Sequence, residues 1–207
     1  VYNRTKSKAE KWTKEYKGKI ANTPAEAAKD ADFVFSCVGN DNDLKEISIG
    51  ENGVFHTIKK GSVYIDNTTA SADIARKLSK SAEAHGFRFL DAPVSGGQAG
   101  AENGALTVMV GGSKVAFEKA LPIIDCYSKK VKLLGPSGSG QLAKMVNQIC
   151  IAGLVQALSE GINFGLNAGL NMKDVIEVIS KGAAQSWQME NRYKTMIDDK
   201  FEFGFAV

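Results

Sequence analysis

The sequence predicts an α/β chain, in which a mostly parallel sheet with helices on its faces is followed by an all-helical domain. From residue 1 to about residue 135, short apolar runs alternate with stretches of helical spacing, which is typical of a mostly parallel sheet. After Gln141, the apolar residues follow helical spacing only. We therefore expect a first domain over residues 1–137 and the start of an all-helical domain over residues 138–207.

The expected strands are short apolar runs that end in small or polar residues. The run over residues 31–38 is continuous rather than alternating, as in a parallel strand buried on both faces, and residues 39–43 read as a turn. Further strands are expected at residues 62–65, 87–90, 106–110 and 131–134.

Helices are expected between these runs, and several have clear end signals. Thr23 is placed as an N-cap before Pro24, Gly86 closes the helix over residues 71–85, and Asn171 caps another helix. The expected helical segments are residues 7–16, a short helix that begins at Pro24, and residues 44–47, 54–58, 71–85, 114–121, 141–163 or beyond, and 171–181.

Composition excludes several classes of protein. The 207 residues are 43% hydrophobic and 24% charged with a net charge of +3, so nothing indicates nucleic-acid binding. Three cysteines without paired spacing argue against a disulfide framework or a metal site and suit a reducing, cytoplasmic location. We expect no membrane span, since no apolar run reaches that length and no signal peptide is visible. The first and last residues both read as cut ends, which suggests a fragment.

Loops that follow strands carry the first group of candidate residues. In an open parallel sheet, ligands bind beyond the carboxyl ends of the strands. Those loops are residues 3–5, 38–43, 66–69 and 91–97. Arg4 lies where a dinucleotide fold places the residue that meets the adenosine ribose, and an arginine there pairs with a 2′-phosphate. An exposed surface charge is the alternative for Arg4.

A small-residue loop at Ser95-Gly96-Gly97 offers backbone N–H groups that no side chain obstructs. Such a loop suits an anion, for instance a carboxylate. A plain turn is the alternative interpretation.

The segment that follows Gly138 combines a glycine turn with a polar helix face. Helical spacing lets Gln141, Lys144, Asn147 and Gln148 project together from the first turns. A lysine there can exchange a proton if burial lowers its pKa. The alternative is a solvated lysine, but a cation in the first turn opposes the helix dipole, and no carboxylate lies nearby in the sequence.

The same segment also reads as a dinucleotide fingerprint. Residues 138–143 have the form G-x-G-x-x-A after a strand-like run, and Glu160 lies about 20 positions further on. A second strand must then follow, yet residues 148–168 have only helical spacing. This interpretation stays open but is disfavoured.

Four motifs resemble the β-hydroxyacid dehydrogenases, a family that includes 3-hydroxyisobutyrate dehydrogenase and tartronate semialdehyde reductase. Residues 91–106 resemble the substrate-binding signature, and Gly138, Gly140, Lys144 and Asn147 resemble the catalytic signature. Residues 35–41 and 66–69 are similar to two cofactor-side loops. The resemblance implies a Rossmann-like mostly parallel sheet followed by a truncated all-α domain. It also implies a first strand with G-x-G-x-x-G that this sequence lacks.

The resemblance further implies an NAD(P)-dependent oxidoreductase that interconverts a β-hydroxy acid and its semialdehyde, of the 3-hydroxyisobutyrate or 2-hydroxy-3-oxopropionate type. It implies that Lys144 is the general acid/base, that Asn147 orients it, and that Gln148 and the loop of Ser95, Gly96 and Gly97 bind substrate. Arg4 favours NADP, with NAD possible, and a homo-oligomer is expected. The alternative is a non-catalytic relative that acts as a binding module. The implied cofactor residues are Asn3, Arg4, Thr5, Cys37, Val38, Gly39, Asn40, Asp43, Thr68 and Thr69.

Overall fold

The computed structural model describes residues 1–202, and it divides the chain into two compact units, Val1–Met145 and Val146–Val207. Residues 203–207, expected as part of the helical domain, lie outside the described residues. Helix α7 (Ser139–Asn167) begins in the first unit and continues in the second. The domain boundary expected at residue 137 stays a prediction.

The first unit is built on a six-stranded sheet with the order β1-β2-β3-β5-β4, in which β6 also pairs with β5. The parallel pairs are β1·β2, β2·β3 and β5·β6, whereas β5 runs antiparallel to β3 and β4. The sheet is therefore mostly parallel, as expected. Its strands are β1 (Phe33–Ser36), β2 (Val63–Asp66), β3 (Arg88–Asp91), β4 (Val94–Ser95), β5 (Leu106–Gly111) and β6 (Ser128–Gly135).

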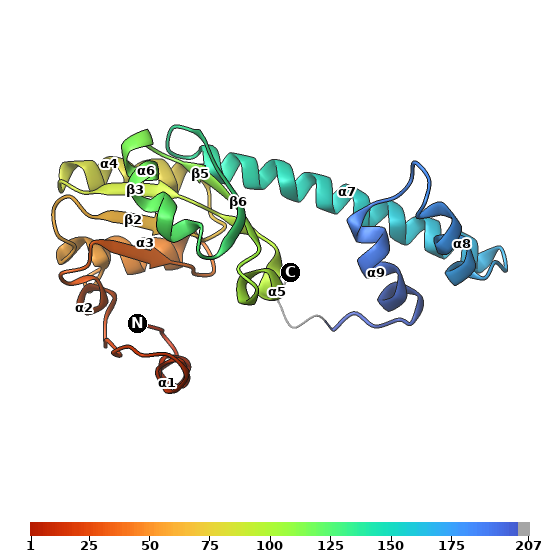
Figure 1. The fold of residues 1–207 in the computed structure, drawn as a ribbon, viewed down its shortest axis with the longest axis horizontal. Coiled ribbons are helices and arrows are strands. Elements are labelled where there is room, and N and C mark those ends of the chain that lie inside the picture. Colours follow the sequence, from red (N-terminus) through yellow and green to blue (C-terminus); the bar gives the residue numbers. More distant parts are fainter. Residues whose placement is uncertain (203–207) are drawn as a thin grey trace. The chain divides into compact units, whose positions relative to one another are not determined.

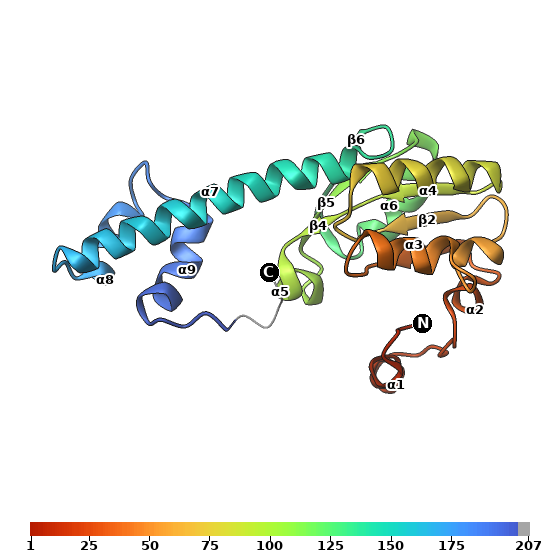
Figure 2. The same cartoon turned by 180° about the vertical axis from the view of Figure 1, so that it is seen from behind.

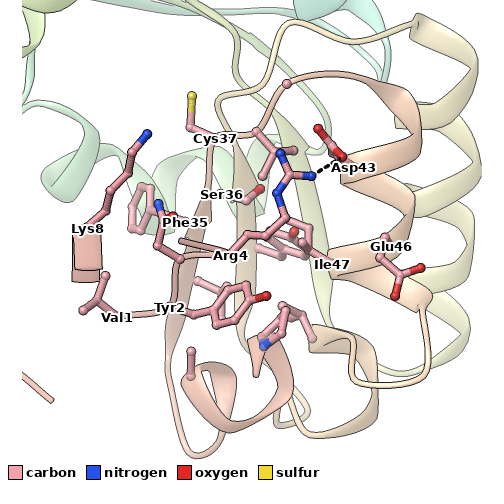
Figure 3. Close-up of a pocket in the computed structure, with 18 of the residues that line it drawn as sticks. Val1, Tyr2, Arg4, Lys8, Phe35, Ser36, Cys37, Asp43, Glu46 and Ile47 are labelled. Carbon is pink, nitrogen blue, oxygen red and sulfur yellow. Dashed lines mark hydrogen bonds and ion pairs between the residues drawn. The ribbon is translucent and has the colours of Figure 1, made fainter. Parts of the chain in front are cut away.

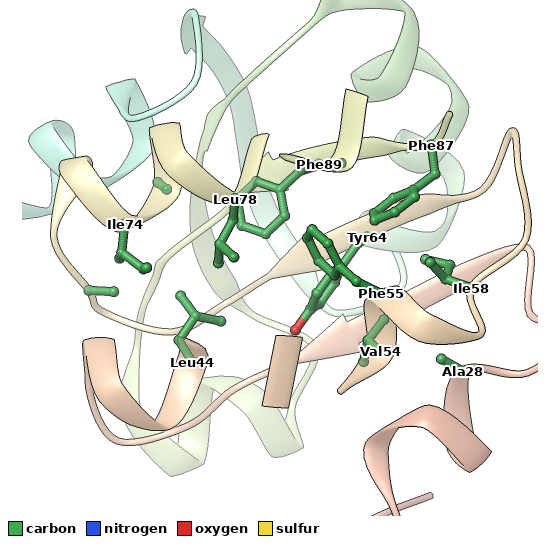
Figure 4. Packing of buried hydrophobic residues seen from close by; sticks show 13 residues of the cluster. Ala28, Leu44, Val54, Phe55, Ile58, Tyr64, Ile74, Leu78, Phe87 and Phe89 are labelled. Carbon is green, nitrogen blue, oxygen red and sulfur yellow. The ribbon is translucent and has the colours of Figure 1, made fainter. Parts of the chain in front are cut away.

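Helices cover both faces of this sheet (Figures 1 and 2). On one face, Phe55 packs edge-on against Tyr64 and Phe87, while Leu44 and Leu78 complete an apolar core (Figure 4). These residues come from the sheet and from α2 (Pro24–Ala28), α3 (Asp41–Ile49), the 3-10 helix η1 (Val54–His56) and α4 (Ala72–Ala84). The other face packs against α6 (Lys114–Ile124). Because both faces are covered, ligands have access at the ends of the strands.

The expected caps at the helix ends of this unit are present. The Thr23 hydroxyl accepts a hydrogen bond from the N–H of Glu26 at 3.0 Å, which caps α2. Gly86 follows α4 with φ of +83°, a left-handed conformation that favours glycine. The first helix, α1 (Lys6–Glu15), lies one residue earlier at each end than the sequence predicts.

Three expectations about local structure are wrong. The strand at residues 31–38 is not buried on both faces, because β1 lies at one edge of the described sheet and Phe35 is 38% exposed. The expected turn at residues 39–43 begins α3, since the Asn40 side chain accepts hydrogen bonds from the N–H groups of Asn42 and Asp43. Helix α6 continues past Leu121 to Ile124 with Pro122 in its last turn. A proline there removes one hydrogen bond without stopping the helix.

Three elements were not expected as elements at all. They are β4, the short helix α5 (Gly97–Glu102) and the helix α9 (Trp187–Ile197). The first two are too short for a periodic pattern, and β4 exists because Val94 and Ser95 pair with Val108 and Thr107 of β5.

The second unit is helical. Residues of α7, of α8 (Met172–Ile179) and of α9 form its core, and Asn171 caps α8 by accepting the N–H of Lys173 at 3.1 Å. Helix α7 has the length and composition to cross a membrane, although the sequence predicted no stretch of that length. The statement about length was wrong because α7 is one uninterrupted helix of 29 residues with few charges, whereas the expected absence of a membrane span stays a prediction. Length and composition of one helix are weak evidence for a membrane span.

Candidate active site

Most of the expected cofactor residues line two cavities that share Gly39 in the first unit. The first cavity, of about 490 Å³, lies beside β1 and is lined by Asn3, Arg4, Thr5, Cys37, Val38, Gly39 and Asp43 (Figure 3). A second, open cavity of about 460 Å³ is lined by Asn40 and Thr69, among others. Thr68 lines neither cavity, because it is fully buried. The sequence analysis thus found residues that the fold brings together from three separate segments, residues 3–5, 37–43 and 69.

Arg4 carries an exposed charge at the first cavity and is held by an ion pair. Its guanidinium pairs with the Asp43 carboxylate (Figure 3), at 3.1 Å from Oδ1, and its side chain is 83% exposed. Lys8 lines the same cavity four residues further along, but sequence reasoning did not single it out. Lys8 is in the first turn of α1, four residues after Arg4, and this spacing was the signal in the sequence that could have identified Lys8.

A buried carboxylate fixes the loops that follow β1 and β2. Asp66 Oδ1 accepts hydrogen bonds from the hydroxyls of Ser36 and Thr68, both at 2.6 Å. The Thr68 hydroxyl in turn accepts the N–H of Val38 at 3.0 Å. Burial raises the pKa of Asp66 to about 6, and its Oδ2 has no hydrogen-bond partner within the described chain. Thr68 therefore holds the shape of the cofactor loops from beneath.

Lys144 is buried, so the interpretation as a solvated lysine is wrong. It is 8% exposed, and its Nζ donates a hydrogen bond to the carbonyl oxygen of Val94 at 2.9 Å. No carboxylate in the described part of the chain forms an ion pair with it. Burial lowers the pKa of Lys144. A buried amine with a lowered pKa is suited to proton exchange near neutral pH.

The N-terminus of α7 is already occupied by Asp91. Oδ1 of Asp91 accepts the N–H of Gly138 at 2.8 Å, and Oδ2 accepts the N–H of Gln141 at 3.1 Å. An anion at this position satisfies free N–H groups and the positive end of the helix dipole. These are the donors that a pyrophosphate would need. Because Asp91 occupies these donors, and because no strand is described after α7 up to residue 202, the structure argues strongly against the fingerprint interpretation of residues 138–143.

The loop at Ser95-Gly96-Gly97 links β4 to α5. Gly96 and Gly97 have φ of +139° and +63°, which favour glycine. A Cβ on Gly97 would have open space around it, whereas one on Gly96 would approach Leu106 at 3.0 Å. The loop thus exposes backbone at Gly97, as an anion site requires, although a turn has the same geometry.

Two expected site residues, Asn147 and Gln148, belong to the second unit. The Asn147 side chain donates a hydrogen bond to the Gln148 side chain at 2.9 Å. Their roles toward Lys144 and the substrate stay predictions.

Sequence reasoning passed over two buried groups in this region. Asp91 lies inside the quoted substrate signature, yet no role was assigned to it, and Gln141 was treated only as part of a polar helix face. Both are fully buried. An acid at the end of an apolar strand was the available signal. Among residues 1–202, no group of three or more His, Cys, Asp or Glu side chains is arranged to hold a metal ion.

Family comparisons match the whole chain. Residues 1–135 match the NAD binding domain of 6-phosphogluconate dehydrogenase, and residues 138–207 match the NAD-binding domain of NADP-dependent 3-hydroxyisobutyrate dehydrogenase. An uncharacterized oxidoreductase of Shewanella frigidimarina is 59% identical over all 207 residues, which span 71% of that protein. A probable mitochondrial 3-hydroxyisobutyrate dehydrogenase of Dictyostelium discoideum is 37% identical over 86% of this chain and 55% of its own length.

A solved structure has the same fold. The 3-hydroxyisobutyrate dehydrogenase of Mycobacterium tuberculosis, determined with L-serine, aligns with a TM-score of 0.87 and 25% identity. The alignment covers 99% of this chain and 72% of that one. The Rossmann-like sheet followed by a helical region is therefore the architecture of the relatives as well.

Proposed function

Because the chain belongs to the β-hydroxyacid dehydrogenase family of NAD(P)-dependent oxidoreductases, we propose that it interconverts a β-hydroxy acid and the matching semialdehyde. The buried Lys144, hydrogen-bonded to Val94 and without a carboxylate partner in the described chain, is the observation that carries this proposal. The geometry of the loops around it supports the same reaction class.

The residues present fit a nicotinamide dinucleotide. Two cavities adjoin at Gly39, at the carboxyl ends of parallel strands, where dinucleotides bind in open α/β sheets. Cations from Arg4 and Lys8 line the first cavity, where they would meet the adenosine end. Val38, Gly39, Asn40 and Thr69 would line the rest, and Thr68 would hold these loops in place from beneath.

Lys144 would move the proton in this reaction. The cofactor supplies a two-electron acceptor for the hydride that leaves the carbon bearing the hydroxyl. In the neutral form, Lys144 accepts the hydroxyl proton as the carbonyl forms, and its ammonium form returns that proton in the reverse direction. The hydrogen bond from Nζ to Val94 uses one donor and leaves the remaining positions of the amine for substrate. Asn147 would orient the lysine or the hydroxyl.

The substrate would be held as a carboxylate by the loop of Ser95, Gly96 and Gly97, and Gln148 is proposed as a further substrate-binding residue. L-serine, present in the related mycobacterial structure, is itself a β-hydroxy acid. This observation supports a small β-hydroxy acid of the 3-hydroxyisobutyrate or 2-hydroxy-3-oxopropionate type as the substrate class.

NADP is the proposed cofactor, in preference to NAD. Arg4 and Lys8 put two positive charges on one cavity, and the first turn of α1 contains no acidic residue. A 2′-phosphate would find both cations and the positive helix end there. Asp43 opposes this choice, because it already pairs with Arg4.

A non-catalytic binding module is the competing function. Such a protein would bind a dinucleotide without turnover and would have no need of a desolvated lysine. Burial of a lysine without a carboxylate partner costs free energy, which favours a catalytic role.

The deciding experiment is steady-state kinetics of Lys144 variants. The purified enzyme is assayed with NADP and NAD against a panel of small β-hydroxy acids, and in reverse with their semialdehydes. Lys144→Ala should lower kcat by about 10²–10⁴-fold, because general acid/base catalysis is lost. Lys144→Arg should also turn over poorly, since guanidinium stays protonated near neutral pH.

Lys77→Ala, at an exposed lysine of α4, is the matched control and should be unchanged. Cofactor affinity, followed by fluorescence, checks that each variant is folded. Wild-type turnover in folded Lys144→Ala would reject the mechanism, and turnover absent from the native enzyme over the whole panel would favour the binding module.

We also propose an assembly and a location for this protein. Val146, Ile149 and Phe164 of α7 are 62%, 72% and 73% exposed in the second unit, so this apolar surface is available to a second copy of the chain. We expect a homo-oligomer by light scattering and a cytoplasmic enzyme without nucleic-acid or membrane partners.

A further inference from the structure

Gln141, three residues before Lys144 on α7, has a fully enclosed polar side chain. It is fully buried, and its side-chain amide uses both ends on one loop. Nε2 donates to the carbonyl oxygen of Thr68 at 2.7 Å, while Oε1 accepts the N–H of Ala70 at 3.0 Å. An amide that satisfies a carbonyl and an N–H two residues apart holds that loop in one conformation.

The loop that Gln141 holds is the one that follows β2. Thr68 is also bonded through its hydroxyl to Asp66, and it accepts the N–H of Val38. Gln141 therefore reaches the network that shapes both cofactor loops, at residues 37–39 and 67–70. No other side chain of α7 among the described residues makes a hydrogen bond to that loop.

The main chain of Gln141 is anchored as firmly as its side chain. Its N–H donates to Asp91, and Lys144 lies three residues further along the same helix. A Cβ on Gly140 would collide with the carbonyl oxygens of Met109 and Asp91, so the first turn of α7 lies directly on the ends of β3 and β5. Any displacement of the loop relative to Lys144 must break a bond to Gln141.

We propose that Gln141 is a positioning residue that sets the spacing between the loop at residues 68–70 and the amino group of Lys144. This inference rests on the proposed function, in which that loop lines the cofactor and Lys144 moves the substrate proton. Hydride and proton transfer at one carbinol group both depend on that spacing, since small misplacements of reacting groups are costly in rate.

The test compares Gln141→Met and Gln141→Glu with the native enzyme. The probe is the β-hydroxy acid oxidised fastest in the substrate panel, used both unlabelled and deuterated at the carbon bearing the hydroxyl. Methionine keeps the length of glutamine but loses both hydrogen bonds. We expect kcat of Gln141→Met to fall by about 10–100-fold, from loss of near-attack geometry. The KM of the acid and the Kd of NADP should stay within about threefold, as remote contacts supply that binding.

The deuterium isotope effect on kcat separates positioning from folding. If hydride transfer becomes slower, the isotope effect should rise, whereas a partly unfolded population lowers kcat and leaves the isotope effect unchanged. Gln156→Met, at an exposed glutamine of α7 that pairs with Glu160, is the matched control and should behave as native.

Gln141→Glu provides rescue by a conservative change. A protonated glutamic acid can donate to Thr68 and accept from Ala70, while an ionised one cannot donate. Asp66, Asp91 and Lys144 are the charged groups around this position. The ratio of variant to native kcat should therefore be highest at acid pH and fall as pH rises.

Each outcome decides between the claims. An unchanged kcat, or a lowered kcat with an unchanged isotope effect in Gln141→Met, overturns the positioning role while the loss of turnover in Lys144→Ala still supports the proposed function. If Gln141→Met fails to fold, the pH course of Gln141→Glu decides, and a flat ratio overturns the proposal. Full turnover in Lys144→Ala rejects the proposed function itself.

Discussion

The N-terminus of α7 and the cavity beside β1 both contain charged residues, but they hold those charges in opposite ways. Around α7, Asp91 and Lys144 are buried and bonded to the main chain. At the cavity, Arg4 is 83% exposed and held by one ion pair to Asp43. Buried hydrogen-bonded charges have strong effects when disturbed, whereas exposed ion pairs contribute little.

Because of this contrast, we expect mutations in the two regions to have different effects. The buried region fixes the geometry of the proposed chemistry, so changes there should alter both stability and turnover. The exposed region is proposed to select between NADP and NAD, so changes there should alter cofactor preference with little effect on folding.

The largest effect is expected at Asp91. Asp91→Ala leaves the N–H groups of Gly138 and Gln141 buried without an acceptor, which should lower the free energy of unfolding by roughly 3 kcal/mol or more. Urea denaturation followed by circular dichroism measures the change. Asp73→Ala removes only a surface pair with Arg76 and should cost less than about 1 kcal/mol. A difference of less than 0.5 kcal/mol, on the order of experimental error, between the two variants would contradict the contrast.

A pH-dependent effect is expected at Asp66. Burial raises its pKa from 3.8 to about 6. The folded state therefore binds this proton more tightly than the unfolded state, so its contribution to stability is complete below pH 3.8 and is lost as pH rises through about 6. Asp66→Asn lacks this loss. Relative to native protein, the variant should gain up to roughly 3 kcal/mol of unfolding free energy between pH 4 and pH 7.

Urea denaturation of both proteins across that pH range provides the measurement for Asp66. The difference between the two curves isolates Asp66 from the other acids that titrate. A difference that does not change with pH would show that Asp66 is ionised in the folded protein at pH 4.

At the cavity, the expected effect is on cofactor preference. Arg4→Asp should move the NADPH/NADH ratio of kcat/KM toward NADH by about tenfold or more, the loss of a charge-assisted contact of roughly 1.5–3 kcal/mol. Steady-state kinetics with both cofactors measures it. Arg88→Ala, at an exposed arginine paired with Glu83, is the control and should leave the ratio unchanged. If the NADPH/NADH ratio of Arg4→Asp equals that of the native enzyme, Arg4 is only a surface charge.

The smallest effect is expected in the loop at residue 97. Gly97→Ala adds a methyl group that points into the open space where the substrate carboxylate is proposed to bind, so it should raise the KM of the acid several-fold and leave NADP affinity nearly unchanged. The left-handed conformation at this position should also cost the variant about 1 kcal/mol of stability. Gly61 also has a left-handed conformation and open surroundings, so Gly61→Ala serves as the control. If NADP affinity falls equally, the loop binds the cofactor rather than the substrate.

Local signals in the sequence determined much of this protein. The alternation of apolar runs and helices and the caps at Thr23 and Asn171 depend on neighbouring residues, and the structure has them. Of the expected loops after strands, residues 3–5 follow no strand of the described chain, and those at residues 38–43 and 91–97 are partly helix or strand. The resemblance in four motifs also identified the family, because those motifs retain order and spacing.

Tertiary structure alone decided how those parts meet. Nothing local tells that Asp91 accepts N–H groups from residues 47 and 50 positions away, or that Gln141 reaches Thr68 across 73 positions. The exposure of β1 at the edge of the sheet and the burial of Lys144 also depend on residues that are distant in the sequence, so no local pattern predicted them. Burial and hydrogen-bond partners depend on packing between distant segments, which no pattern of neighbouring residues specifies.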